Sequence, residues 1–148
     1  MSDKLFIASD HAAFWQKKFL VEKLNDSYDI EDLGTNSEDS VHYPRYAIAL
    51  VESVLKTPNS RGILLCGSGI GVSIVANRYK GIRAALCRDI EDAEMSRKHN
   101  DSNVLCLGGR KTSEDELLEV VKVWLAEEFE AGRHQTRVDM FDGLGEPI

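Results

Sequence analysis

Short apolar runs alternate along the chain with longer segments in which apolar residues recur every three or four positions. The short runs predict strands at 4–9, 28–33, 62–66, 82–87 and 103–107. The longer segments predict helices at 11–25, 44–56, 70–78, 89–98 and 113–129. A further short helix is expected at 132–138, and 143–148 is expected to fray.

Strands that alternate with helices predict a parallel sheet covered by helices on both faces. The run at 62–66 is almost entirely apolar, which is typical of a strand buried on both sides. Because crossovers between parallel strands are right-handed, few topologies remain. We expect a three-layer α/β fold with a five-stranded Rossmann-like or flavodoxin-like sheet. The 148 residues fit one domain, 1–148, with a helical tail at about 132–142.

One rim of this sheet is the expected place for a ligand, because open parallel sheets bind ligands beyond the carboxyl ends of their strands. Four loops meet there: Asp10-His11, 35–43, Cys66–Gly71 and 108–110. We therefore look for functional groups among these loops first.

Cys66 ends the central apolar run directly before a glycine-rich turn and a predicted helix. Most free cysteines are small buried hydrophobic residues, and we expect Cys87 and Cys106 to be of that kind. Cys66 differs because a thiolate is stabilised where a helix begins. Its position is equally compatible with packing and with chemistry.

The turn after Cys66 has the pattern Gly67-x-Gly69-x-Gly71. Val72 stands where a dinucleotide fingerprint has its third glycine, and no Gly-Lys-Ser/Thr follows, which excludes a P-loop. Asp89 lies near the distance expected of a ribose-binding acid, so a dinucleotide site remains an open alternative.

Two pairs of residues that contain histidine flank predicted helices. Asp10-His11 lies at the rim, although Asp10 is also a good helix N-cap. His99-Asn100 closes the helix at 89–98, where both residue types are common helix ends. That helix end lies at the opposite end of the sheet from Cys66. A catalytic His99 would therefore serve the site of another subunit and implies an oligomer with shared sites.

Arg133 and Arg137 are four residues apart, so both project from one face of a helix. Together with Arg110 they would suit a phosphate, which guanidinium groups bind in bidentate fashion. Spacing alone favours a solvated helix that pairs with the neighbouring glutamates.

Composition and charge narrow the possible partners and compartment. The chain has 18 basic and 25 acidic side chains and a net charge of -7, which argues against nucleic-acid binding. No apolar run approaches the ~20 residues of a membrane span, and no signal peptide is expected. Three widely spaced cysteines fit a reducing, cytoplasmic compartment. No spacing of cysteines or histidines predicts a metal site.

Several short blocks of residues occur in order between about Leu5 and Val138. They are Asp10-His11, His42-Tyr43-Pro44, Cys66-Gly67-Ser68-Gly69-Ile70-Gly71, Ala76-Asn77-Arg78, Gly81-Ile82-Arg83-Ala84, Ser96-Arg97-Lys98-His99-Asn100-Asp101 and Gly132-Arg133-His134-Gln135-x-Arg137. In this order and at this separation they resemble ribose-5-phosphate isomerase B. The resemblance implies interconversion of ribose 5-phosphate and ribulose 5-phosphate, a step of the pentose phosphate pathway, through an enediolate and without metal or cofactor.

The resemblance also implies a role for each matching position. Cys66 would move the proton between C2 and C1, with Ser68 assisting, and Asp10 and His99 would open the furanose ring. The substrate would be contacted by Gly67, Gly69, Ile70, Gly71, Tyr43 and Asn100. Its phosphate would be held by His11, Arg110, Arg133 and Arg137, some of them from a partner chain. One branch of the family uses a glutamate as base where this chain has Val72, which leaves Cys66 as the candidate.

Other substrates and roles stay open. The chain also resembles galactose-6-phosphate isomerase subunits in its glycine loop. Those subunits lack the combination of the His-Asn pair and the arginines, which this chain has, and this difference disfavours that activity. Allose 6-phosphate stays possible as a substrate, and so does a non-catalytic sensor of a sugar phosphate or nucleotide. For the main interpretation we expect a homodimer, or a tetramer, with active sites shared between subunits.

Overall fold

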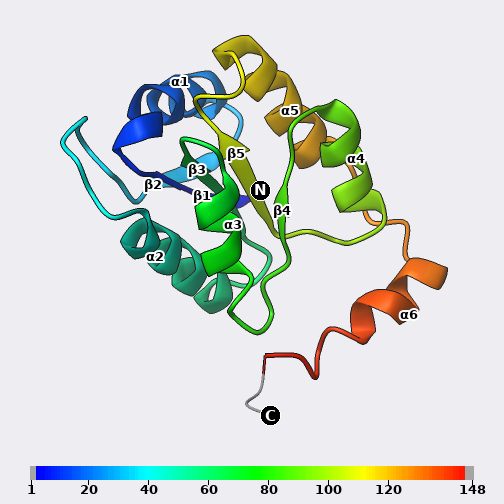
Figure 1. Ribbon diagram of the computed structural model, residues 1–148. Helices are drawn as coiled ribbons and strands as arrows, with labels where there is room; N and C mark the ends of the chain where they lie inside the picture. Colours follow the sequence, from blue (N-terminus) through cyan, green and yellow to red (C-terminus); the bar gives the residue numbers. More distant parts are fainter. Residues whose placement is uncertain (1–2, 146–148) are drawn as a thin grey trace.

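Five parallel strands form the centre of the structure, a computed structural model that describes residues 3–145 (Figure 1). Their spatial order is β2-β1-β3-β5-β4. Their bounds are β1 (Lys4–Ser9), β2 (Asp29–Asp32), β3 (Arg61–Cys66), β4 (Ala84–Leu86) and β5 (Val104–Gly108). The predicted five-stranded parallel sheet is confirmed, with an order that differs from both the flavodoxin sheet and the Rossmann sheet.

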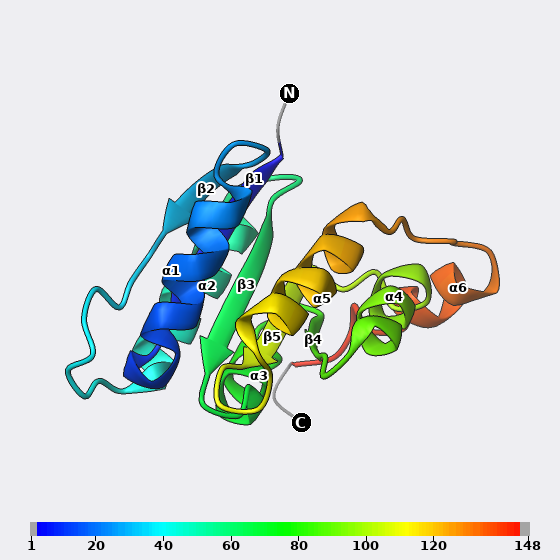
Figure 2. The same cartoon turned by 90° about the horizontal axis from the view of Figure 1, so that it is seen from above.

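Helices cover both faces of the sheet (Figure 2). One face carries α1 (Phe14–Leu24), α4 (Ile90–Lys98) and α5 (Glu114–Ala126), and the other carries α2 (Tyr43–Lys56) and α3 (Ile70–Ala76). A short 3-10 turn, η1 (His11–Ala13), precedes α1. The last helix, α6 (Arg133–Asp139), lies beyond α4 and away from the sheet (Figures 1 and 2). None of the helices within residues 3–145 has the length and apolar character needed to cross a membrane.

The central strand β3 shows why its sequence is apolar throughout. Ile63 and Leu65 pack in the core beneath α1 and α5, whereas Leu64 and Cys66 pack in the core beneath α2 and α3. Successive side chains of a strand point to opposite faces, so a strand with helices on both sides needs apolar residues at every position.

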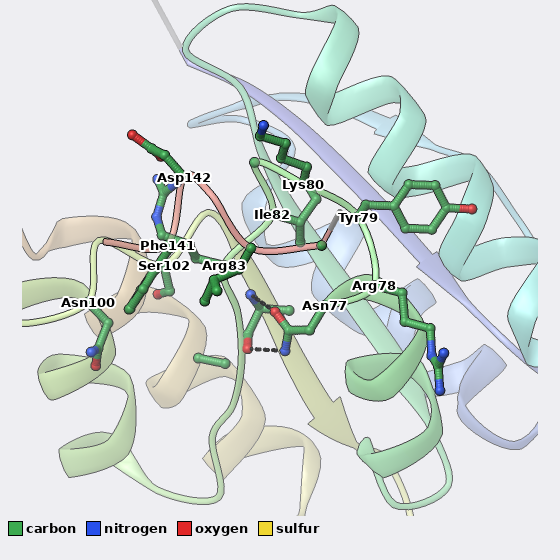
Figure 3. A pocket seen from close by; sticks show the side chains of 15 residues that line it. Asn77, Arg78, Tyr79, Lys80, Ile82, Arg83, Asn100, Ser102, Phe141 and Asp142 are labelled. Carbon is green, nitrogen blue, oxygen red and sulfur yellow. Dashed lines mark hydrogen bonds between the residues drawn. The ribbon is translucent and has the colours of Figure 1, made fainter. Parts of the chain in front are cut away.

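The edge strand β4 differs most from the prediction, because it spans three residues rather than 82–87. The amide side chain of Asn77 occupies its free edge at Ala84: Nδ2 donates to the Ala84 carbonyl at 2.9 Å, and the Ala84 N–H donates to Oδ1 at 2.8 Å (Figure 3). A side chain thus takes the place of a neighbouring strand. Smaller corrections apply to helix ends: the helix predicted from residue 11 begins as η1, and those predicted to end at 78 and 129 end at 76 and 126. Residues 141–145 form turns, and 146–148 of the predicted fraying tail lie outside the described residues.

The connections after the three central strands create the site. The chain leaves β1 and β5 toward the face that carries α1 and α5, but it leaves β3 toward the opposite face, into α3. Adjacent strands whose connections diverge leave a crevice at their carboxyl ends. The end of β3 therefore has such a crevice on each side, and Cys66 lies between them.

Candidate active site

The turn between β3 and α3 is held against the end of β5. The N–H of Gly109 donates to the Cys66 carbonyl at 2.8 Å, and the N–H of Arg110 donates to the Gly67 carbonyl at 3.0 Å. Gly69 has φ 78, and a Cβ there would lie 2.9 Å from the carbonyl carbon of Leu107. Glycine is required at this position both for the left-handed backbone conformation and for the close approach of the turn to the backbone of β5.

Cys66 sits with its sulfur inside this turn, and its side chain is 5% exposed. The backbone N–H of Gly69 donates to Sγ at 3.1 Å, and the N–H of Ile70 donates to Ser68 Oγ at 3.2 Å. The turn therefore holds the Cys66 sulfur by a hydrogen bond from its own backbone.

The other two cysteines lack such an environment. Burial raises the pKa of Cys87 to about 12 and also raises the pKa of Cys106, which is fully enclosed. Both stay protonated near neutral pH and act as core residues, as the sequence predicts.

An open hollow of about 690 Å³ lies over the turn. Its lining includes Asp10, Tyr43, Cys66, Gly67, Ser68, Ile70, Gly71 and Arg110. Two glycines allow large side chains to come close: a Cβ on Gly71 would lie 2.6 Å from Tyr43 Cζ, and a Cβ on Gly67 would lie 3.4 Å from Arg110 Cδ. The predicted rim loops do converge on one place.

Asp10 and His11 tie this hollow to the loop that leads to Tyr43. The Asp10 carboxylate accepts the N–H of Ala12 at 3.0 Å, so it caps η1 while it also lines the hollow. His11 Nδ1 accepts the N–H of Val41 at 3.1 Å, which leaves the proton of a neutral ring on Nε2. His11 lies next to the lining residues rather than among them.

A second group of predicted site residues lies elsewhere. His99 follows α4, and Arg133 and Arg137 belong to α6. Strand register measures the separation: Gly62 pairs with Val104 and Cys66 pairs with Gly108, so the start of β5 is four residues from the level of Cys66. At 3.3 Å per residue this is about 13 Å along the sheet.

Within one chain, therefore, the structure does not bring His99, Asn100, Arg133 and Arg137 to the Cys66 hollow. This agrees with the expectation that His99 lies at the opposite end of the sheet. Of the three arginines that the resemblance places at the phosphate, Arg110 lines the hollow, and Arg133 and Arg137 do not.

His134 belongs to this second group, although the sequence motif alone attached no role to it. Its ring stacks on that of His99 with the centroids 4.2 Å apart and an interplanar angle of 12°. It is 6% exposed, and its Nε2 has no hydrogen-bond partner among the described residues. Burial, His99 and Arg133 lower the pKa of His134 below its ordinary value of 6.5. Only tertiary structure reveals this stack, since the two histidines are 35 residues apart along the chain.

A more enclosed cavity of about 380 Å³ lies between the α3–β4 connection and the turns that follow α6 (Figure 3). Asn100 borders it, beside Arg83, Ser102 and Phe141. Among the described residues its lining holds no thiol or histidine, so we assign the chemistry to the Cys66 hollow instead.

The dinucleotide alternative is not supported. Asp89, the candidate ribose-binding acid, follows the edge strand β4, and β5 separates that strand from β3. Its carboxylate accepts the N–H of Asp92 at 2.8 Å and caps α4. Asp89 is therefore a helix cap at a distance from the glycine turn.

A thiol beside backbone donors and a carboxylate, at a switch point of a parallel sheet, defines an α/β enzyme of the proton-transfer class. The chain belongs to the Ribose/Galactose Isomerase family, whose model matches residues 5–141.

Known proteins of this kind are similar over almost the whole chain. Ribose-5-phosphate isomerase B of Escherichia coli (strain K12) is 39% identical over 142 residues, which cover 95% of each chain. The crystal structure of a ribose 5-phosphate isomerase from Thermotoga maritima is 44% identical with a TM-score of 0.93, and the match covers 97% of this chain and 100% of that one. The structure of ribose-5-phosphate isomerase B from Mycoplasma genitalium with bound ribulose-5-phosphate is 37% identical, with a TM-score of 0.91 and coverage of 96% and 95%.

Proposed function

We propose that this protein interconverts ribose 5-phosphate and ribulose 5-phosphate, with Cys66 as the base. The observation that carries the proposal is the Gly69 N–H that donates to Cys66 Sγ at 3.1 Å in the hollow at the switch point. The Mycoplasma genitalium relative with bound ribulose-5-phosphate, at 37% identity, supports the same substrate pair.

The chemistry is an aldose–ketose isomerisation. The Cys66 thiolate takes the proton from C2 of open-chain ribose 5-phosphate, and the released electron pair forms the C1–C2 double bond. The carbonyl π electrons move to O1, which gives an enediolate. Ser68 passes a proton from O2 to O1, and the Cys66 thiol returns its proton to C1, so C2 becomes the ketone. Backbone N–H groups of Gly67–Gly71 stabilise the negative charge.

The remaining residues bind and prepare the substrate. Asp10 and His99 open the furanose ring, and Tyr43 and Asn100 contact the sugar. The phosphate is held by His11, Arg110, Arg133 and Arg137. Binding energy from the phosphate, remote from C1 and C2, helps to hold the reacting atoms in place.

These assignments require two copies of the chain, because His99 and the α6 arginines lie far from Cys66 in one copy. Next to the hollow, α3 exposes Ile70 (45%) and Ile74 (56%), one helical turn apart. This apolar face suits a second copy that brings its own His99 and α6 to the hollow. We infer a homodimer with shared sites as the smallest active unit, and a tetramer would be a pair of such dimers.

The whole chain, 1–148, acts in this proposal as one isomerase domain. Its reaction belongs in the cytoplasm, because the three cysteines are free and Cys66 has to stay reduced to act as a base.

The first prediction concerns Cys66→Ala. Loss of a positioned base lowers the rate by about 10²–10⁴-fold, so turnover of ribose 5-phosphate should fall by at least about 10²-fold. Binding of ribulose 5-phosphate, followed by calorimetry, should persist because the phosphate contacts remain. Cys87→Ala is the matched control, because it removes a buried thiol away from the hollow. Unchanged turnover in Cys66→Ala would refute the assignment of the base, and a wild-type protein that binds but never turns over would identify a sensor.

A further inference from the structure

We propose that His134 is a positioning residue for His99: its buried ring fixes the plane of the His99 ring and leaves His99 as the one member of the pair that exchanges protons with the substrate. This rests on the role given to His99 under the proposed function.

The backbone brings the two rings together and holds them there. The N–H of Glu130 donates to the carbonyl of Lys98 at 3.1 Å, which fixes the segment before α6 on the end of α4. The chain then turns at Ala131 and Gly132, which have φ 55 and 57. The His134 N–H donates to the Ala131 carbonyl at 3.0 Å, so the side chain enters beside His99.

The contact covers one face of the His99 ring and leaves its edge free. His99 is half-buried, and neither of its nitrogens has a hydrogen-bond partner within residues 3–145. A proton donor needs this combination, because it has to be held in orientation while a nitrogen stays open to the substrate. Without the stack, the His99 side chain at the end of α4 would rotate between rotamers.

Charge also separates the roles of the two rings. His134 faces His99 on α4, Arg133 and Arg137 on α6, and Glu130, whose Oε2 lies 3.9 Å from Nε2. The positive neighbours and burial disfavour a proton on His134 more than Glu130 favours one. A proton on His134 is therefore disfavoured near neutral pH, and His99 is the more exposed of the two rings.

The side chains of His99, Glu130 and His134 lie close together, but their geometry does not suit a metal ion. His99, Glu130 and His134 have ligand atoms within 4.8 Å of one another. Ring nitrogens bind a metal along lone pairs that lie in the ring plane. In two nearly parallel stacked rings these lone pairs run side by side instead of converging on one ion.

The test compares His134→Phe with His134→Leu. Phenylalanine keeps a flat ring against His99, whereas leucine fills similar volume without a flat face. Turnover of ribose 5-phosphate should stay within about threefold of wild type in His134→Phe and fall at least about tenfold in His134→Leu, with KM nearly unchanged. Val138→Ala, at the other buried position of α6 and one turn after His134, controls for loosened packing and should leave turnover unchanged.

A second measurement isolates the step that His99 serves. Ribulose 5-phosphate is open-chain because its C2 ketone cannot form a furanose with the phosphorylated O5. Exchange of its C1 hydrogen in D₂O therefore needs Cys66 but no ring opening. We expect His134→Leu and His99→Ala to keep this exchange while they lose conversion of ribose 5-phosphate, and Cys66→Ala to lose both.

The outcomes separate the inference from the proposed function. Full conversion of ribose 5-phosphate by His99→Ala would overturn the role of His99 itself. If His99→Ala loses conversion but His134→Leu matches Val138→Ala, the positioning role of His134 is wrong. Equal loss of exchange and conversion in His134→Leu would show a general structural defect and would also overturn it.

Discussion

At the scale of single residues, Gly69 shapes the turn that holds the Cys66 thiol. Gly69 combines φ 78 with a Cβ position 2.9 Å from the backbone of β5, and its N–H is the donor to Cys66 Sγ. A side chain at this position would strain the turn and move the donor. The glycine pattern is visible in the sequence, but which glycine is indispensable follows only from φ and from the neighbouring strand.

We therefore expect Gly69→Ala to lose both stability and activity. A left-handed conformation costs a non-glycine residue about 1–2 kcal/mol, and the contact with Leu107 adds to this. Gly81→Ala is a matched control, because Gly81 has φ 87 but meets only the exposed side chain of Leu55. Chemical denaturation should show loss of stability in both variants, and turnover should fall in Gly69→Ala alone. Normal turnover in Gly69→Ala would argue against a role for this N–H.

At the scale of elements, a buried lysine joins α1 to the loop that leads to Tyr43. Lys17 is fully buried, and its Nζ lies 2.6 Å from Asp32 Oδ1 and 2.7 Å from the Thr35 carbonyl. Asp32 ends β2, so one ammonium group fixes the helix, the strand and the start of the loop. The helical pattern of apolar residues places α1 but gives no sign that a lysine lies inside, because charged residues are rarely buried.

Lys17→Met should destabilise the protein by about 2–4 kcal/mol, because breaking a buried ion pair leaves its partner unpaired and Asp32 is only partly exposed. The neighbouring Lys18→Met, at an exposed position, should change stability by no more than about 0.5 kcal/mol. Urea denaturation of the two variants measures both values. Equal stability of the two would mean that the Lys17 contacts contribute nothing.

At the scale of the whole molecule, the sheet separates the two halves of the proposed active site. Cys66 lies beyond the carboxyl end of β3, and His99 lies near the start of β5. Two copies related by a twofold axis would place each half against the other and form two complete sites. The exposed isoleucines of α3 lie beside one of these halves.

Mixing two inactive variants tests this arrangement. Cys66→Ala and His99→Ala chains should form hybrids in which one of the two sites is intact. Random pairing makes half of the dimers hybrid, so about a quarter of wild-type activity should return. Hybrids purified by two affinity tags control for the extent of exchange. Proven hybrids without activity would contradict a role for His99 across the subunit boundary.

The sequence alone was enough to predict the alternation of strands and helices, the parallel sheet and the loops that meet at its rim. These features depend on local patterns: apolar runs, helical periodicity, and the glycines and prolines that mark turns and the ends of elements. It also placed His99 at the far end of the sheet from Cys66, because a crossover helix runs antiparallel to the strands.

The folded structure was needed to establish the strand order, the burial of Lys17, the distance of Asp89 from the glycine turn and the stack of His99 on His134. Each depends on contacts between residues that lie far apart along the chain. Whether a histidine ring is covered on one face, or a lysine is enclosed by a helix and a loop, depends on packing, and no local pattern of residues encodes it.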